Sequence, residues 1–150
     1  MTSDCRFKNM NWEEFKDLPP ENKVGFFNSG KKPFHTLAAQ QFDREMLDTM
    51  GLLATKIRRI AKSKSGMNFL QSLLSHKRAM LYFSQPSSRT FLSFYAACQI
   101  VGVKPAEVRE TSTSSEMKGE SPEDTVRTFS SYFDMLIMRT PQRAFAERMA

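Results

Sequence analysis

The feature that most limits the possible folds of this chain is an uninterrupted apolar run of strand length. The run covers residues 79–83, Ala-Met-Leu-Tyr-Phe, and polar residues bound it on both sides. A strand with one wet face alternates apolar and polar residues, as in many antiparallel sheets. An uninterrupted run is instead typical of a strand buried on both faces. The run therefore predicts a strand of a parallel sheet that helices cover.

The segments around this run alternate between helix and strand patterns. The predicted helices cover residues 43–62 and 91–101, open at Ser121-Pro122-Glu123-Asp124, and begin again within 142–150; the other predicted strands cover 108–111 and 135–138. Serine as cap, proline in the first turn and acids beside it make residue 121 a strong helix start. Gly102 is placed to end the second helix. Alternating strands and helices imply an α/β fold with a parallel sheet and right-handed crossovers.

The two ends of the chain differ from its middle. Residues 1–42 are the least regular, because Pro19-Pro20 stops a short helix near residue 12, and glycines and Pro33 interrupt the residues after it. We expect an amino-terminal arm here, whose aromatic side chains dock on the body. Residues 43–150 carry the strand and helix alternation, which has not closed at residue 150. We therefore expect them to form an incomplete domain.

Composition excludes several classes of protein. With 150 residues, 40% of them hydrophobic and 25% charged, the chain is neither collagen-like nor mostly disordered. No apolar run approaches the roughly 18 residues that cross a bilayer, and no secretory signal pattern follows the first methionine. Two cysteines and two histidines offer almost no metal ligands. We expect a cytoplasmic protein without a membrane partner.

A net charge of +6 is compatible with an anionic ligand, whether nucleic acid, acidic membrane or phosphorylated metabolite. The basic stretch 58–62, Arg-Arg-Ile-Ala-Lys, suits a nucleic-acid contact, but a solvated carboxyl end of a helix explains it better. We therefore expect no nucleic-acid partner, and a basic helical nucleic-acid binder is kept as an alternative.

Ligands of open parallel sheets bind outside the carboxyl ends of the strands. Residues 87–90, Ser-Ser-Arg-Thr, join the buried strand to the next helix and combine free backbone N–H groups, hydroxyls and a guanidinium, which suits a phosphate. A helix cap beside a surface arginine explains the same residues equally well. Arg139 ends another predicted strand, where a salt bridge is the commoner role. If the two strands are neighbours, Arg89 and Arg139 converge on one pocket, which an anion would stabilise.

Three segments resemble one known family. Residues 83–94, Phe-Ser-Gln-Pro-Ser-Ser-Arg-Thr-Phe-Leu-Ser-Phe, resemble the carbamoyl-phosphate-binding motif of the aspartate and ornithine carbamoyltransferases, a Ser-Thr-Arg-Thr turn. Residues 118–125, which begin Lys-Gly-Glu-Ser, resemble the Lys-Gly-Glu loop of the aspartate branch, and residues 134–141 resemble its strand ending in Arg-His-Pro. Three motifs in the family's order and spacing are a specific signal.

The resemblance implies a fold, a reaction and a set of site residues. The fold would be the three-layer, amino-terminal carbamoyl-phosphate-binding domain, without the amino-acid-binding domain. The reaction would transfer the carbamoyl group of carbamoyl phosphate to the amine of L-aspartate, in pyrimidine biosynthesis, with no metal or cofactor. The implied residues are Ser87, Ser88, Arg89 and Thr90 for the phosphate, Thr90 and Arg139 for the carbonyl group, and Ser114 and Lys118 donated to a neighbouring subunit. Lys118 joins Arg89, Thr90 and Arg139 as a catalytic residue, and the shared site implies a homotrimer.

The chain departs from the family's motifs at a few positions. Ser88 replaces a threonine and keeps the hydroxyl, Gln85 stands where glutamate is common, and Thr140 replaces a histidine. Phe91 stands where a second arginine is often found. The family's His-Pro-x-Gln segment would lie after residue 150. We therefore expect this chain alone to bind carbamoyl phosphate weakly and to have no turnover.

Two alternatives within the same fold stay open. One is an ornithine-type or other carbamoyltransferase, against which the Lys-Gly-Glu sequence at 118–120 argues. The other is a non-catalytic module that binds phosphate for regulation, which would fit Gln85 and Phe91.

Overall fold

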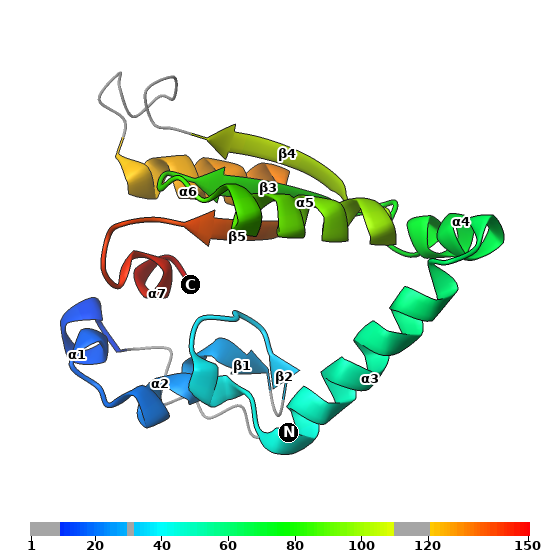
Figure 1. The fold of residues 1–150 in the computed structure, drawn as a ribbon. Coiled ribbons are helices and arrows are strands. Elements are labelled where there is room, and N and C mark those ends of the chain that lie inside the picture. The colour runs from blue at the N-terminus through cyan, green and yellow to red at the C-terminus, as the bar shows by residue number, and fades with distance from the viewer. Residues whose placement is uncertain (1–9, 30–31, 110–120) are drawn as a thin grey trace. The chain divides into compact units, whose positions relative to one another are not determined.

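The computed structural model describes residues 10–29, 32–109 and 121–150 of the chain (Figure 1). These residues fall into two compact units. The larger runs from Gly51 to Arg143, and the smaller combines the chain up to Met50 with Ala144–Ala150. Among the described residues, no helix is long and apolar enough to span a membrane.

The larger unit is built on a parallel sheet of three strands. These are β3 (Arg78–Phe83), β4 (Lys104–Arg109) and β5 (Met135–Arg139), in the spatial order β4-β3-β5. Five of the six residues of β3 are buried, which confirms the prediction from the apolar run. The strands point the same way, so their carboxyl ends share one edge (Figure 1).

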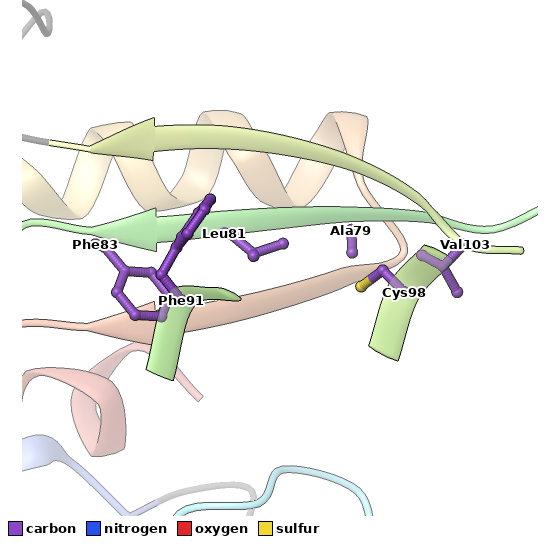
Figure 2. Packing of buried hydrophobic residues seen from close by; sticks show 6 residues of the cluster. All are labelled: Ala79, Leu81, Phe83, Phe91, Cys98 and Val103. Atoms are coloured by element: carbon purple, nitrogen blue, oxygen red, sulfur yellow. The ribbon is translucent and has the colours of Figure 1, made fainter. Parts of the chain in front are cut away.

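Helices cover both faces of this sheet. The α5 helix (Ser88–Val101) contacts β3 and β4, and α6 (Pro122–Tyr132) contacts β5 from the opposite face (Figure 1). The α5 face buries an apolar cluster, which Figure 2 shows: Ala79, Leu81, Phe83, Phe91, Cys98 and Val103. On the α6 face, the rings of Tyr82 and Phe129 meet edge to face, with 5.6 Å between their centroids. The expected three-layer α/β architecture is confirmed.

Capping groups set the helix boundaries in this unit. The Ser121 hydroxyl accepts a hydrogen bond from the backbone N–H of Asp124 at 3.1 Å, as the helix-start pattern predicts. Gly102 ends α5 in the left-handed conformation, with φ of 82°, which also confirms its predicted role. A helix that the apolar pattern did not reveal, α4 (Lys64–Leu73), begins where the Ser63 hydroxyl accepts from the N–H of Gly66 at 3.0 Å.

The strand predicted over 108–111 begins four residues earlier and ends at Arg109. Three of the first four residues of β4, Lys104, Pro105 and Glu107, have low strand propensity and hide the strand in the sequence. Proline is tolerated because β4 is an edge strand of the described sheet. Because β4 ends at Arg109, this residue lies at the carboxyl end of the strand and not inside it, as the predicted range of 108–111 had implied.

The long helix α3 (Arg44–Ile60) matches the helix predicted over 43–62. The Asp43 carboxylate caps it by accepting from the N–H of Met46 at 2.8 Å. No residue of α3 is buried among the described residues, and Leu53 is 56% exposed. Helical spacing therefore identified an apolar face correctly, but periodicity carries no information on what covers such a face.

The smaller unit holds the remaining elements. They are α1 (Trp12–Lys16), α2 (Pro20–Phe27), β1 (Asn28–Ser29), β2 (Lys32–Pro33), the 3-10 helix η2 (Ala39–Gln41) and α7 (Phe145–Met149). The Phe15 ring packs edge to face on Phe26 and Phe27. The Pro19-Pro20 pair was predicted to stop a helix, but Pro20 also begins the next helix, α2. Proline is accepted there because the N–H groups of the first helical turn have no partner within the helix. Residues 20–27 are thus helical where only an arm was expected.

Candidate anion-binding site

The central strand ends between two arginines. Phe83, the last residue of β3, is the register partner of Arg109 in β4 and of Arg139 in β5. Register partners in parallel strands project to the same face of the sheet. Phe83 projects toward α5, since its ring centroid lies 5.5 Å from that of Phe91. Both arginine side chains therefore leave the carboxyl edge on the α5 side.

The turn that follows β3 is fastened to the end of β5. The backbone N–H of Gln85 and the hydroxyl of Ser84 both donate to the carbonyl oxygen of Arg139, each at 3.3 Å. The strands β3 and β5 are neighbours, which is the condition set for the predicted convergence of Arg89 and Arg139 on one pocket. The start of α5 and the end of β5 thus lie at the same corner of the sheet.

The first turn of α5 keeps its backbone N–H groups free of a side-chain cap. Ser87 is the N-cap residue, but its hydroxyl makes no capping hydrogen bond. Only its carbonyl oxygen takes part, accepting from the N–H of Phe91 at 3.0 Å. The alternative explanation, that this turn is only a helix cap, therefore does not hold for the hydroxyl of Ser87. The uncapped N–H groups at the positive end of the helix dipole favour an anion.

The guanidinium groups at this edge have no acidic partner in the described part of the chain. Arg89 is exposed and makes no ion pair there. The Nε atom of Arg139 is buried and lacks a hydrogen-bond acceptor among the described residues. A buried guanidinium nitrogen without an acceptor is costly, and an anionic ligand would remove that cost. The alternative role of Arg139 as a salt-bridge partner is not supported, because no carboxylate among the described residues pairs with it.

Arg109 is a further basic residue at this edge, and the predicted site residues do not include it. Its guanidinium carbon lies 4.4 Å from the centroid of the Phe91 ring, in a cation–π contact. The signal was present, because a basic residue at the end of a strand, before a polar segment, belongs to the edge where ligands bind. The predicted strand covered residues 108–111, so Arg109 did not stand at its end and this signal was overlooked.

Two predicted residues, Ser114 and Lys118, lie outside the described residues, so their donation to a neighbouring subunit stays a prediction. In the described ranges, no group of three or more His, Cys, Asp or Glu side chains could hold a metal ion. What the described geometry offers is a cationic edge with uncapped helix N–H groups, which suits a small oxyanion such as a phosphoryl group.

Comparison with known proteins points to one family. Residues 35–150 match the family model described as aspartate/ornithine carbamoyltransferase, carbamoyl-P binding domain. The chain is 36% identical over 107 residues to the aspartate carbamoyltransferase catalytic subunit of Methanosarcina acetivorans, covering 71% of this chain and 33% of the relative. It is 37% identical over 118 residues to the chloroplastic aspartate carbamoyltransferase of Arabidopsis thaliana, covering 76% of this chain and 28% of that one.

Solved structures agree. Aspartate transcarbamoylase from Trypanosoma cruzi, in complex with carbamoyl aspartate and phosphate, superposes with a TM-score of 0.69 at 33% identity, over 76% of this chain and 35% of that chain. The same enzyme in complex with carbamoyl phosphate superposes with a TM-score of 0.66. This chain spans about a third of the length of the curated relatives it matches.

Proposed function

Because this chain belongs to the aspartate/ornithine carbamoyltransferase family, we propose that it supplies the carbamoyl-phosphate site of an aspartate carbamoyltransferase. The whole protein would transfer the carbamoyl group of carbamoyl phosphate to the amine of L-aspartate. The products would be N-carbamoyl-L-aspartate and phosphate, a step in pyrimidine synthesis. The domain would run from residue 43 to 150, after an amino-terminal arm.

One observation carries this proposal: Arg89 and Arg139 lie at one corner of the sheet without an acidic partner among the described residues. The hydroxyls and N–H groups of residues 87–90, with the Arg89 guanidinium, would bind the three terminal phosphate oxygens. The Thr90 hydroxyl and the Arg139 guanidinium would donate to the carbamoyl oxygen. No protein side chain has to become a covalent nucleophile in this scheme.

The chemistry then depends on positioning and charge. When the amine attacks the carbamoyl carbon, negative charge develops on the carbamoyl oxygen, where Thr90 and Arg139 would stabilise it. The bond between the carbon and the bridging oxygen then breaks, and phosphate leaves with the electron pair and takes up the proton that the attacking amine loses. Arg89 would stabilise the growing charge on the phosphate. Holding the two reactants in this geometry removes much of the entropic barrier.

The proposal includes an assembly and a compartment. Ser114 and Lys118 would complete the site of a neighbouring subunit in a homotrimer, so each site would need two copies of the chain. We also retain the cytoplasmic location expected from the sequence, although the Arabidopsis relative is named chloroplastic.

The test uses the full-length protein that carries this chain. Carbamoyl phosphate is supplied with L-aspartate or with L-ornithine, and the carbamoylated product is measured. We expect product from aspartate, and Arg89→Ala should abolish it while Arg127→Ala, an exposed substitution on α6, should not. Product from ornithine alone would contradict the assignment to the aspartate branch.

Mixed trimers test the shared site. Arg89→Ala and Lys118→Ala proteins, each inactive alone, are dissociated, mixed in equal amounts and reassembled. A site with Arg89 from one subunit and Lys118 from its neighbour is intact, so about a quarter of the wild-type activity should return in random trimers. Absence of recovery in verified mixed trimers would contradict the sharing of sites.

A further inference from the structure

We infer that Arg109 is an additional phosphate-binding residue of this site and that Phe91 is the residue that holds its guanidinium in place. The inference rests on the proposed function, because it concerns the same corner of the sheet. Neither residue was among the positions implied by the family's motifs as binding groups.

Arg109 is placed at the site by the backbone of β4. It is the last residue of that strand, and its register partner is Phe83 at the end of the central strand. Phe91, over whose ring the guanidinium lies at 4.4 Å, directly follows Thr90 in the first turn of α5. The guanidinium is therefore held beside the turn that would bind phosphate, on the face of the sheet that Arg139 also leaves.

The Phe91 ring is itself held firmly. It is 4% exposed and meets the Phe83 ring at an interplanar angle of 90°, with Tyr95 at a centroid distance of 5.7 Å. Figure 2 shows the Phe83 and Phe91 rings against each other near the ends of the strands. A ring fixed by core packing provides an ordered platform for an arginine, which would otherwise lose side-chain entropy on binding an anion.

Within the described part of the chain, the donors of Arg109 remain available to a ligand. A cation–π contact engages the face of the ring and uses none of the five guanidinium N–H groups. Arg109 is exposed, and in the described residues it forms no ion pair. The planar guanidinium matches the geometry of a carboxylate or a phosphoryl group, and phosphate is the ligand that the neighbouring turn would bind.

The arrangement also accounts for the phenylalanine at position 91. The family that the motifs resemble often carries a second arginine at this position, so Phe91 leaves the turn with one positive charge fewer. Arg109 returns a positive charge to the same place from the neighbouring strand, and Phe91 is what positions it.

The test is isothermal titration of the full-length protein with inorganic phosphate at constant ionic strength. Arg109→Ala should weaken binding about tenfold or more, as for loss of a charged hydrogen-bonding group. Arg109→Lys should restore part of the affinity. Arg127→Ala is the matched control, because Arg127 is an exposed arginine on α6 that pairs with Asp124, and it should bind like the wild type.

Phe91→Leu tests the platform while keeping the position apolar. It should weaken phosphate binding about two- to fivefold, the range expected for an exposed cation–π contact. Combined with Arg109→Ala, it should cause no further loss, because its effect acts only through Arg109. Phe91→Met replaces it if thermal melting shows that the leucine variant is not folded.

The outcomes separate this inference from the proposed function. If Arg89→Ala loses phosphate and Arg109→Ala binds like the wild type, Arg109 is outside the site and the proposed function stands. If the wild type does not bind phosphate, or if Arg89→Ala binds equally well, both fall. If Phe91→Leu has no effect while Arg109→Ala weakens binding, the role of Phe91 is refuted.

Discussion

The backbone N–H of Gln85 donates a hydrogen bond to the carbonyl oxygen of Arg139, with 3.3 Å between nitrogen and oxygen. The Ser84 hydroxyl donates to the same oxygen. These two bonds, one from the main chain and one from a side chain, couple the turn before α5 to the end of β5. The backbone that leads to Arg89 is thereby held beside the backbone of Arg139 without a ligand, which is the preorganisation that the proposed site would require.

Ser87 and Ser121 occupy the same N-cap position of two helices but should respond differently to alanine. The Ser121 hydroxyl caps α6, so Ser121→Ala should lower the free energy of unfolding by about 1 kcal/mol. The Ser87 hydroxyl makes no cap bond, so Ser87→Ala should change stability little and weaken phosphate binding. Urea unfolding and phosphate titration measure the two effects. Equal destabilisation by both variants would show that Ser87 is a helix cap.

Arg139→Met should leave the ligand-free protein as stable as the wild type, or up to about 1 kcal/mol more stable. It removes a buried nitrogen that has no acceptor among the described residues, and it keeps the side-chain volume. Arg127→Met, which breaks an exposed ion pair, should stay within about 0.5 kcal/mol of the wild type. Urea unfolding without phosphate measures both. A loss of more than about 2 kcal/mol for Arg139→Met would indicate a structural role.

The sequence predicted the elements whose signal is local. The apolar run of β3 and the serine–proline start of α6 identified a parallel sheet with helical layers, since burial and capping leave their mark on neighbouring residues. β4 was placed too late because Pro105 and the charges around it resemble a loop. The strand order, which brings the turn before Arg89 next to Arg139, depends on tertiary structure. The sequence analysis could state it only as a condition.

Arg109 was absent from the predicted residues for the same reason, because its placement depends on tertiary structure. Arg109 contacts Phe91 across 18 positions of sequence, and no local pattern reports such a pairing. The helical period of the sequence revealed the apolar face of α3. It could not reveal that this face is left uncovered in the described chain, because that depends on tertiary packing. Long-range contacts are thus the information that periodicity and motifs leave out.

Gly102→Ala and Gly51→Ala should have opposite effects on stability. Gly102 has φ of 82°, and a Cβ atom there would lie 1.8 Å from the carbonyl oxygen of Gln71, so alanine should cost at least about 2 kcal/mol. Gly51 lies inside α3 with no atom near an added Cβ, so alanine should add up to about 1 kcal/mol of stability. Thermal unfolding measures both. A neutral Gly102→Ala variant would contradict the close contact between α4 and α5.

The carboxylate of Asp134 should make stability depend on pH in acid. A hydrogen bond from the backbone N–H of Arg78, helped by Lys77, lowers the pKa of Asp134 below its usual 3.8. The unfolded chain then binds this proton more readily, so the contribution is present above pH 3.8 and is lost as the pH falls through the depressed pKa.

Asp134→Asn should accordingly be less stable than the wild type at pH 7, and the difference should shrink in acid. Urea midpoints measured at a series of pH values test this. Asp48→Asn, which removes only an exposed helix ion pair, is the control. A constant difference between wild type and Asp134→Asn at every pH would contradict the lowered pKa.

Thermal protection by carbamoyl phosphate tests most directly whether the corner between β3 and β5 binds the phosphate group. At a ligand concentration one hundred times the dissociation constant, binding should add about 2.7 kcal/mol, which corresponds to a rise in Tm of about 5–10 °C. We expect this rise in the wild type and in Arg127→Ala, and its loss in Arg89→Ala. Equal protection of Arg89→Ala and the wild type would contradict a phosphate site at this edge of the sheet.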